Sequence, residues 1–242
     1  MFTSGHFIWL LVIAAVIAAL LFTVRRCKIP ALWVQRTSTV VLVILKLFHL
    51  SLSMKESVHG GLVIDQTQLS FHLCSIMIYA VILSNFIKNE RVLSRIKSFM
   101  VPCLMIGALM ALLIPTEGVD PTMPRVWQYM LIHGALVFYG LYLALIEKAD
   151  LSIRAYGSNL LLMSGVMMVA FLMNSVLEQY GTNFLFLRLP PMEDLPILNL
   201  NNGWYVYFVT LVAVACLLLF LVHLPFIIAQ AVKAHKKKAR RG

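Results

Sequence analysis

Seven long apolar runs constrain this chain more than any other feature of its sequence. They cover approximately residues 6–24, 37–54, 69–87, 100–115, 126–146, 154–177 and 204–229. A bilayer core needs about 20 apolar residues in a helix, so we predict an all-α polytopic membrane bundle of about seven transmembrane helices. The fourth run is short and bounded by Pro102 and Pro115, which predicts a kinked or partly re-entrant helix there. With 61% hydrophobic and 12% charged residues, the chain is not a soluble enzyme, a secreted domain or a nucleic-acid-binding protein.

The basic residues favour one orientation of this bundle. Sixteen of the 20 Lys and Arg residues fall in the first, third and fifth loops and the C-terminal tail, whereas the other loops hold Lys55, Arg125 and Arg188. Because cytoplasmic loops are enriched in Lys and Arg, we predict that the N-terminus lies outside and the C-terminus in the cytoplasm. We expect one transmembrane domain over residues 1–232 and a basic cytoplasmic tail over 233–242. The tail anchors this topology, and a cluster of this kind can also attract anionic lipids.

A few ionisable side chains lie inside the apolar runs, and they gather at one depth. They are Lys46, His49, His72, Cys74 and His133, joined by the amide of Asn174. With the N-terminus outside, these residues lie within about 12 Å of the outer ends of their helices at 1.5 Å per residue. The inner halves hold no comparable side chain apart from Cys103 and Cys216, which read as small apolar fillers. The pattern predicts a polar cavity in the outer leaflet.

The residue types in this layer restrict its chemistry. All Asp and Glu residues lie outside the runs, which argues against a paired-carboxylate hydrolase or a carboxylate relay. A Cys nucleophile activated by His is the remaining combination. His72 and Cys74 point to nearly opposite faces of a regular helix, so His133 or His49 is the better base for Cys74.

Each of these residues also has a structural interpretation. Cys74 alone can be a buried filler, and His133 alone can be a hydrogen-bond donor between helices. Lys46 can have a buried partner or bind a phosphate-bearing ligand. The three histidines could hold zinc or iron, although no spacing places two of them on one helix face.

Short motifs along the chain occur in a characteristic order. They are Phe71-His72-Leu73-Cys74-Ser75, the segment from Gly107-Ala108 to Ile114-Pro115, Ile132-His133-Gly134, and Asn174 followed by Gly181-Thr182-Asn183-Phe184 and Pro190. In this order they resemble the YwaF-like bacterial integral membrane proteins and the transmembrane protein 164 family, over about residues 5–230. The resemblance implies an acyltransferase acting on membrane lysophospholipids, with Cys74 and His133 at its Cys and His positions. The family's Asn-Tyr pair is Asn183-Phe184 here, so acyl specificity does not carry over.

These observations and the resemblance together predict a membrane-embedded lipid acyltransferase, either a transacylase or a phospholipid acyl hydrolase. Cys74 and His133 would be catalytic, and no metal or cofactor is expected. The residues expected to contact the phospholipid or lysophospholipid are His49, Lys46, His72, Asn174 and Asn183. The alternatives are a small-solute transporter that uses the same polar layer and a non-catalytic partner of a larger membrane assembly. We expect a multi-pass protein of the cell membrane, specifically a bacterial plasma membrane.

Overall fold

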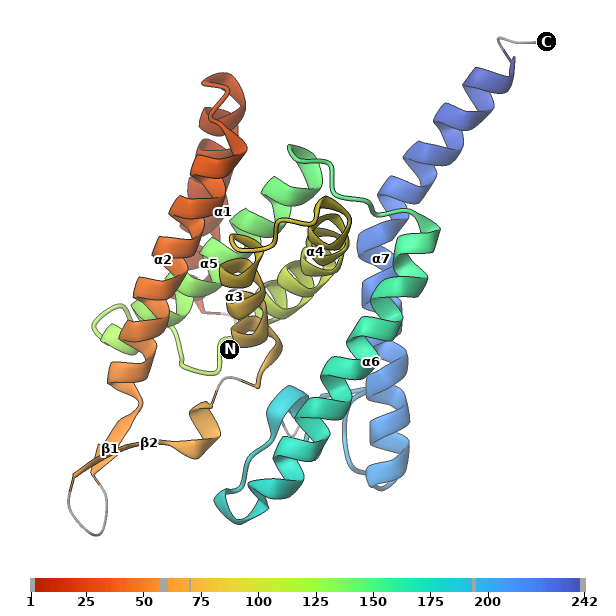
Figure 1. The fold of residues 1–242 in the computed structure, drawn as a ribbon. Helices are drawn as coiled ribbons and strands as arrows, with labels where there is room; N and C mark the ends of the chain where they lie inside the picture. Colours follow the sequence, from red (N-terminus) through yellow and green to blue (C-terminus); the bar gives the residue numbers. More distant parts are fainter. Residues whose placement is uncertain (1–2, 57–60, 70, 193–194, 240–242) are drawn as a thin grey trace. The chain divides into compact units, whose positions relative to one another are not determined.

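Seven α-helices form most of the structure described here. The structure is a computed structural model that describes residues 3–56, 61–69, 71–192 and 195–239, and the chain divides into two compact units, Met1–Ala149 and Asp150–Gly242. The first unit holds α1 (Ser4–Arg26), α2 (Ala31–Leu52), α3 (Leu73–Ser84), α4 (Glu90–Leu113) and α5 (Pro124–Leu145), and the second holds α6 (Ile153–Val176) and α7 (Trp204–Ala239) (Figure 1). Six of the described helices are long and apolar enough to cross a membrane. The predicted all-α polytopic membrane protein is confirmed.

The short helix is α3, not α4, which corrects the expected lengths of the third and fourth helices. The segment before α3 forms a 3-10 turn (Gln66–Gln68) and then extended backbone up to His72, so α3 has only 12 residues. In contrast, α4 has 24 residues and continues through Pro102. Its first two turns are polar, and Asn89 caps them by accepting hydrogen bonds from the backbone N–H groups of Arg91 and Val92. An apolar-run criterion misses such a capped polar segment.

The helix α5 is the centre of the first unit. It contacts α1, α2, α3 and α4, and more than half of the residues in its most apolar stretch are buried. Two glycines permit this close packing. A Cβ atom at Gly134 would lie 3.2 Å from Cγ2 of Ile13 on α1, and a Cβ atom at Gly140 would lie 3.1 Å from Cβ of Leu104 on α4. Small residues allow helix backbones to approach in this way inside a membrane.

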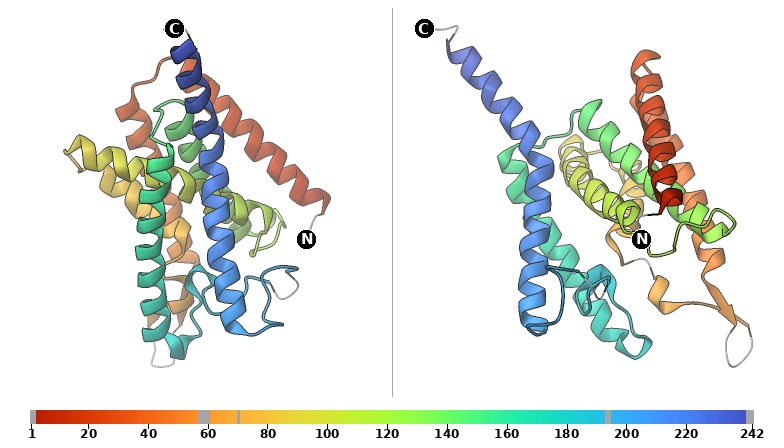
Figure 2. Two further views of the ribbon diagram at one scale, coloured as in Figure 1. Left: turned by 90° about the vertical axis from the view of Figure 1, so that its right-hand side faces the viewer. Right: turned by 180° about the vertical axis from the view of Figure 1, so that it is seen from behind.

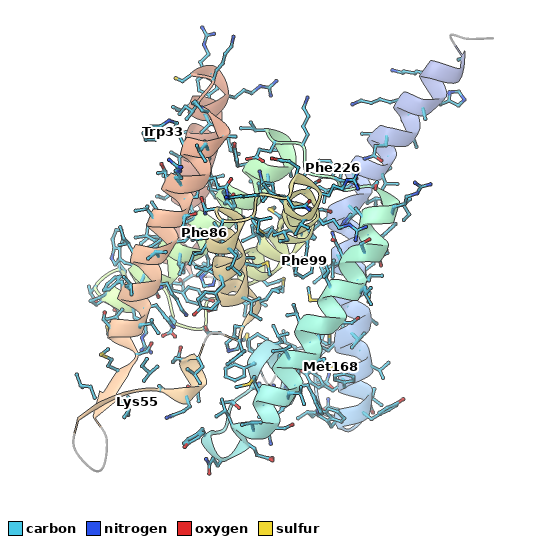
Figure 3. The ribbon with its side chains drawn as sticks, viewed as in Figure 1. Trp33, Lys55, Phe86, Phe99, Met168 and Phe226 are labelled. Carbon is cyan, nitrogen blue, oxygen red and sulfur yellow. The ribbon has the colours of Figure 1, made fainter. Side chains whose placement is uncertain are left out.

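A two-stranded hairpin follows α2. The strands β1 (Met54–Glu56) and β2 (Leu62–Ile64) pair in antiparallel register, and the hairpin extends beyond the end of α2 (Figure 2). Trp33 and Lys55 mark the two opposite ends of this helix and hairpin (Figure 3). The Lys55 ammonium forms an ion pair with Asp65, and this hydrogen bond holds the pKa of the Asp65 carboxyl below its usual value.

In the second unit, α6 and α7 lie side by side (Figures 1 and 2). Between them, Nδ2 of Asn159 lies 3.1 Å from Nε2 of His223, and both side chains are buried. Nδ1 of His223 donates to the Leu219 carbonyl, so Nε2 is the acceptor for the amide. His223 lies about 28 Å along α7 from Trp204 at 1.5 Å per residue, in the half expected to be cytoplasmic. The expectation that the inner halves contain no such ionisable side chain is therefore wrong.

Packing at α5 is tested by adding one methyl group. Gly140→Ala places a Cβ against Leu104 Cβ, which belongs to a neighbouring helix and has no rotamer that moves it aside, so we expect a loss of about 1–3 kcal/mol in folding free energy. The control is Gly157→Ala on α6, where nothing lies within 4 Å of the new atom. It should leave the protein unchanged or slightly more stable. The melting temperature in detergent measures both effects, and equal values for the two variants would contradict the packing argument.

The orientation is tested by thiol labelling in sealed vesicles. Cys27 lies exposed after α1, on the side rich in basic residues, so a membrane-impermeant maleimide should label it only from the cytoplasmic face. The matched reporter is Asn202→Cys, made in a chain without other cysteines, in the exposed loop before α7; it should be labelled only from outside. Labelling of Cys27 from outside would reverse the predicted topology.

Candidate functional site

Cys74 lies in the first turn of α3. His72 is the N-cap of this helix, and Leu73 and Cys74 are its first two residues. The partial positive charge at a helix N-terminus stabilises a thiolate. The sulfur packs against α4, because a Cβ atom at Gly107 would lie 3.1 Å from Sγ of Cys74 and 3.4 Å from Cδ2 of Leu73. Gly107 therefore leaves the space that the thiol occupies.

Lys46 brings a positive charge to the same place from α2. Its side chain is only 7% exposed, and Nζ donates a hydrogen bond of 3.1 Å to Oγ of Ser75, the residue after Cys74. The ammonium is also close enough to interact electrostatically with Cys74, His49 and His72. Burying a charge is costly unless it is hydrogen-bonded or paired, so the Ser75 hydroxyl contributes to holding Lys46 there.

His133 is oriented by its own helix. Nδ1 lies 2.7 Å from the carbonyl oxygen of Tyr129, and because a carbonyl only accepts, Nδ1 carries the proton. The two rings are 4.3 Å apart between centroids, and the Tyr129 hydroxyl donates to the Ala111 carbonyl on α4. None of the hydrogen bonds found among the described residues uses Nε2 of His133, so this nitrogen is left as a proton acceptor.

The remaining two histidines lie at the edges of the same layer. His49 makes a side-chain hydrogen bond with Gln128 and contacts the backbone of Gln68, and Gln128 in turn donates to the Leu45 carbonyl. His72 has extended backbone, so it is not on the helix with Cys74. The argument that placed the two side chains on opposite faces of one regular helix does not apply, because α3 begins only after His72.

The structure brings five predicted residues of the first unit into one group, which we call the Cys74 cluster: Lys46, His49, His72, Cys74 and His133. Electrostatic interactions connect Lys46 to Cys74, His49 and His72, and His49 to His133. Over the ranges that the structure describes, no hydrogen bond joins Cys74 directly to His133, and no three His, Cys, Asp or Glu side chains are arranged to hold a metal ion. Within this cluster, the Lys46 ammonium brings a positive charge into interaction with the Cys74 thiol.

Asn174 and Asn183 belong to the second unit. The amide of Asn174 is hydrogen-bonded at both ends to the backbone of Phe184, with Nδ2 at 3.0 Å from the carbonyl and Oδ1 at 2.7 Å from the N–H. The Asn183 amide likewise bonds the backbone of Arg188 and Leu189. Both amides thus hold the loop between α6 and α7, in which Leu185 and Phe186 have positive φ.

A pocket of about 440 Å³ lies beside this loop. An ion pair between Arg188 and Glu178 crosses part of its wall. The residues that line it are Phe171, Asn174, Ser175, Glu178, Gly181, Thr182, Arg188, Leu189 and Trp204. Asn174 reaches the pocket wall, but its polar atoms are engaged by the loop.

Sequence reasoning missed four residues that shape the Cys74 cluster. Ser75, Gln128 and Tyr129 supply its hydrogen bonds, and Gly107 supplies its space. Two signals were available: Tyr129 stands one helical turn before His133, and Gln128 is an amide inside the fifth apolar run. The Lys46 to Ser75 bond joins different helices, so no spacing in the sequence indicates it.

The role of Asn174 is tested by removing its amide. Asn174→Ala removes the two hydrogen bonds that its amide makes with the backbone N–H and C=O of Phe184, and losing the partner of a buried polar group costs about 1–3 kcal/mol. Backbone amides over residues 183–189 should then exchange with deuterium at least about tenfold faster, since 1.4 kcal/mol corresponds to that factor. The control is Ser175→Ala, whose exposed hydroxyl bonds only its own helix at Phe171, and which should exchange like the parent protein. Unchanged exchange in Asn174→Ala would show that the loop does not need this amide.

Comparison with known proteins identifies the family of the chain. A search of curated proteins and a search of solved structures found no match. The family model of the TMEM164 family matches residues 1–223, a range that contains all five residues of the Cys74 cluster and both asparagines. The chain therefore belongs to the TMEM164 family.

Proposed function

We propose that the protein is a membrane phospholipid acyltransferase in which Cys74 carries the acyl group. The observation that carries this proposal is the position of Cys74, on the first turn of α3 and beside the buried Lys46 ammonium. His133 supports it, because its Nδ1 proton is held by Tyr129 and Nε2 remains available as a base. The resemblance to a lipid acyltransferase family points to the same Cys and His positions.

The first half of the reaction forms a thioester. His133 Nε2 takes the proton of the Cys74 thiol, and the thiolate attacks the carbonyl carbon of a phospholipid acyl ester. The bond between that carbon and the glycerol oxygen breaks, and the glycerol oxygen takes the proton back from His133. The products are a lysophospholipid and an acyl group on Cys74.

The second half transfers the acyl group. The hydroxyl of a second lysophospholipid loses its proton to His133 and attacks the thioester carbonyl, the carbon–sulfur bond breaks, and the Cys74 thiolate is protonated by His133. Water in place of this hydroxyl gives phospholipid acyl hydrolysis. Lys46, His49 and His72 provide donors for the headgroup phosphate and for the negative charge that develops on the carbonyl oxygen.

The expected location of the reaction follows from the orientation of the bundle. With the N-terminus outside, the Cys74 cluster lies in the outer leaflet, where a lipid can reach it laterally from the bilayer. We place the protein in a bacterial plasma membrane, with phospholipid and lysophospholipid as its partners and anionic lipids at the basic end of α7.

The test is to incubate the purified protein with labelled phospholipid in vesicles and to measure both acyl adducts by intact mass and lipid turnover. The parent protein and the control Cys27→Ala, an exposed cysteine outside the site, should carry one adduct. Cys74→Ala should carry none, and His133→Ala should transfer the acyl group about 10²–10⁴-fold more slowly.

Two outcomes would contradict the proposal. Full lipid turnover by Cys74→Ala would remove Cys74 as the nucleophile. If Cys74→Ala and His133→Ala lose uptake of a solute into vesicles while no variant shows lipid chemistry, the same residues serve a transporter.

A further inference from the structure

No carboxylate of the described residues forms an ion pair with Lys46. The ion pairs found in the described ranges are Lys55 with Asp65, Lys97 with Glu147, Arg125 with Glu117, and Arg188 with Glu178. Lys46 belongs to none of them, although its side chain is buried within a transmembrane helix. A buried ammonium in this position requires an anion or a set of strong acceptors, and one serine hydroxyl meets only part of that requirement.

Among the residues that the structure describes, the acidic side chain that interacts with the Lys46 charge is the Cys74 thiol. The hydrogen bond from Lys46 to Ser75 fixes the ammonium against the first turn of α3, and Ser75 is the next residue after Cys74. The N-terminus of α3 adds its own positive potential at the same turn. Two independent features, a helix N-terminus and a tethered ammonium, thus favour negative charge on one sulfur.

We infer that Lys46, tethered by Ser75, is a positioning residue that stabilises the Cys74 thiolate. The inference rests on the proposed function for its purpose, but it concerns a property of the thiol that exists without lipid. The thiol proton leaves to His133, as in the proposed reaction, while Lys46 stays protonated and balances the charge on sulfur. When the thioester forms, the sulfur becomes neutral and the ammonium is released toward the carbonyl oxygen or the headgroup phosphate.

Several other groups face this pair and belong to the same electrostatic balance. Tyr129 on α5 and Cys103 on α4 interact with Cys74, and His49 and His72 interact with Lys46. The two histidines carry no counter-charge for Lys46, since their protonated forms repel it. Removing Lys46 is therefore the substitution that changes the charge beside the sulfur most directly.

The test measures the rate of alkylation of Cys74 as a function of pH. Full-length protein in phosphatidylcholine vesicles is treated with iodoacetamide from pH 6 to pH 10, and the modified Cys74 peptide is quantified by mass spectrometry. Because only the thiolate reacts, Lys46→Met should lower the rate at pH 8 by about tenfold and move the midpoint upward by about one pH unit. Ser75→Ala, which removes only the tether, should move it in the same direction by less.

The matched control is Lys46→Arg, which keeps the charge and should stay within about twofold of the parent rate. A purely structural role predicts the opposite pattern, in which Met, with its apolar stem, is tolerated in the buried site and Arg is not. An unchanged pH profile in Lys46→Met, or in Ser75→Ala if Lys46→Met does not fold, would overturn the inference. Since Ser75→Ala leaves the lysine in place, it keeps the test valid if Lys46→Met does not fold.

Parallel measurement of acyl transfer separates the two proposals. If Lys46→Met moves the alkylation profile while the parent protein shows no lipid chemistry, the proposed function fails and the inference stands. If the parent protein transfers acyl groups through Cys74 while the profile of Lys46→Met stays unchanged, the function stands and the inference fails.

Discussion

A polar group inside hydrocarbon must find its partner within the protein, and the rest of this structure depends on that constraint. The helices satisfy most of the backbone, and several buried side chains find their partners across helix interfaces. Lys46 on α2 bonds Ser75 on α3, and Asn159 on α6 contacts His223 on α7. Each of these bonds selects one arrangement of its helix pair, because any other arrangement would leave a polar atom in an apolar environment.

Close packing around α5 brings the side chains of the candidate site together. Gly134 and Gly140 let α1 and α4 approach α5, and Gly107 lets the Cys74 sulfur rest against α4. Because α3 begins only at Leu73, Cys74 lies on its first turn, where the sulfur packs against α4. A longer helix starting before residue 72 would have placed His72 and Cys74 on one regular helix and turned them to different faces.

Several features were predictable from individual residues. The apolar runs indicated the long helices, and the depths of Lys46, His49, Cys74 and His133 indicated that their side chains share a layer. The start of α3 was not predictable, because Leu69, Phe71 and Leu73 are as apolar as residues inside a helix. The polar first turns of α4 were hidden for the opposite reason, since Arg91, Arg95 and Lys97 interrupt the apolar pattern although the Asn89 cap makes them helical. The inner pair of Asn159 and His223 shows that polar residues also gather away from the Cys74 cluster.

The sequence by itself determined that the chain spans a membrane several times, because 12% charged residues cannot cover a soluble fold of this size. It also determined the depth of Lys46, His49, Cys74 and His133 along their helices, because that depth follows from residue number. Only the tertiary structure decided which of them meet. Contacts such as Lys46 with Ser75 and Cys74 with Gly107 join residues about 30 positions apart, and rotation and close approach of whole helices, which no local pattern encodes, bring them together. Asn174 is likewise placed by a contact outside its own helix, because its amide donates to the carbonyl and accepts from the N–H of Phe184 in the loop that follows α6.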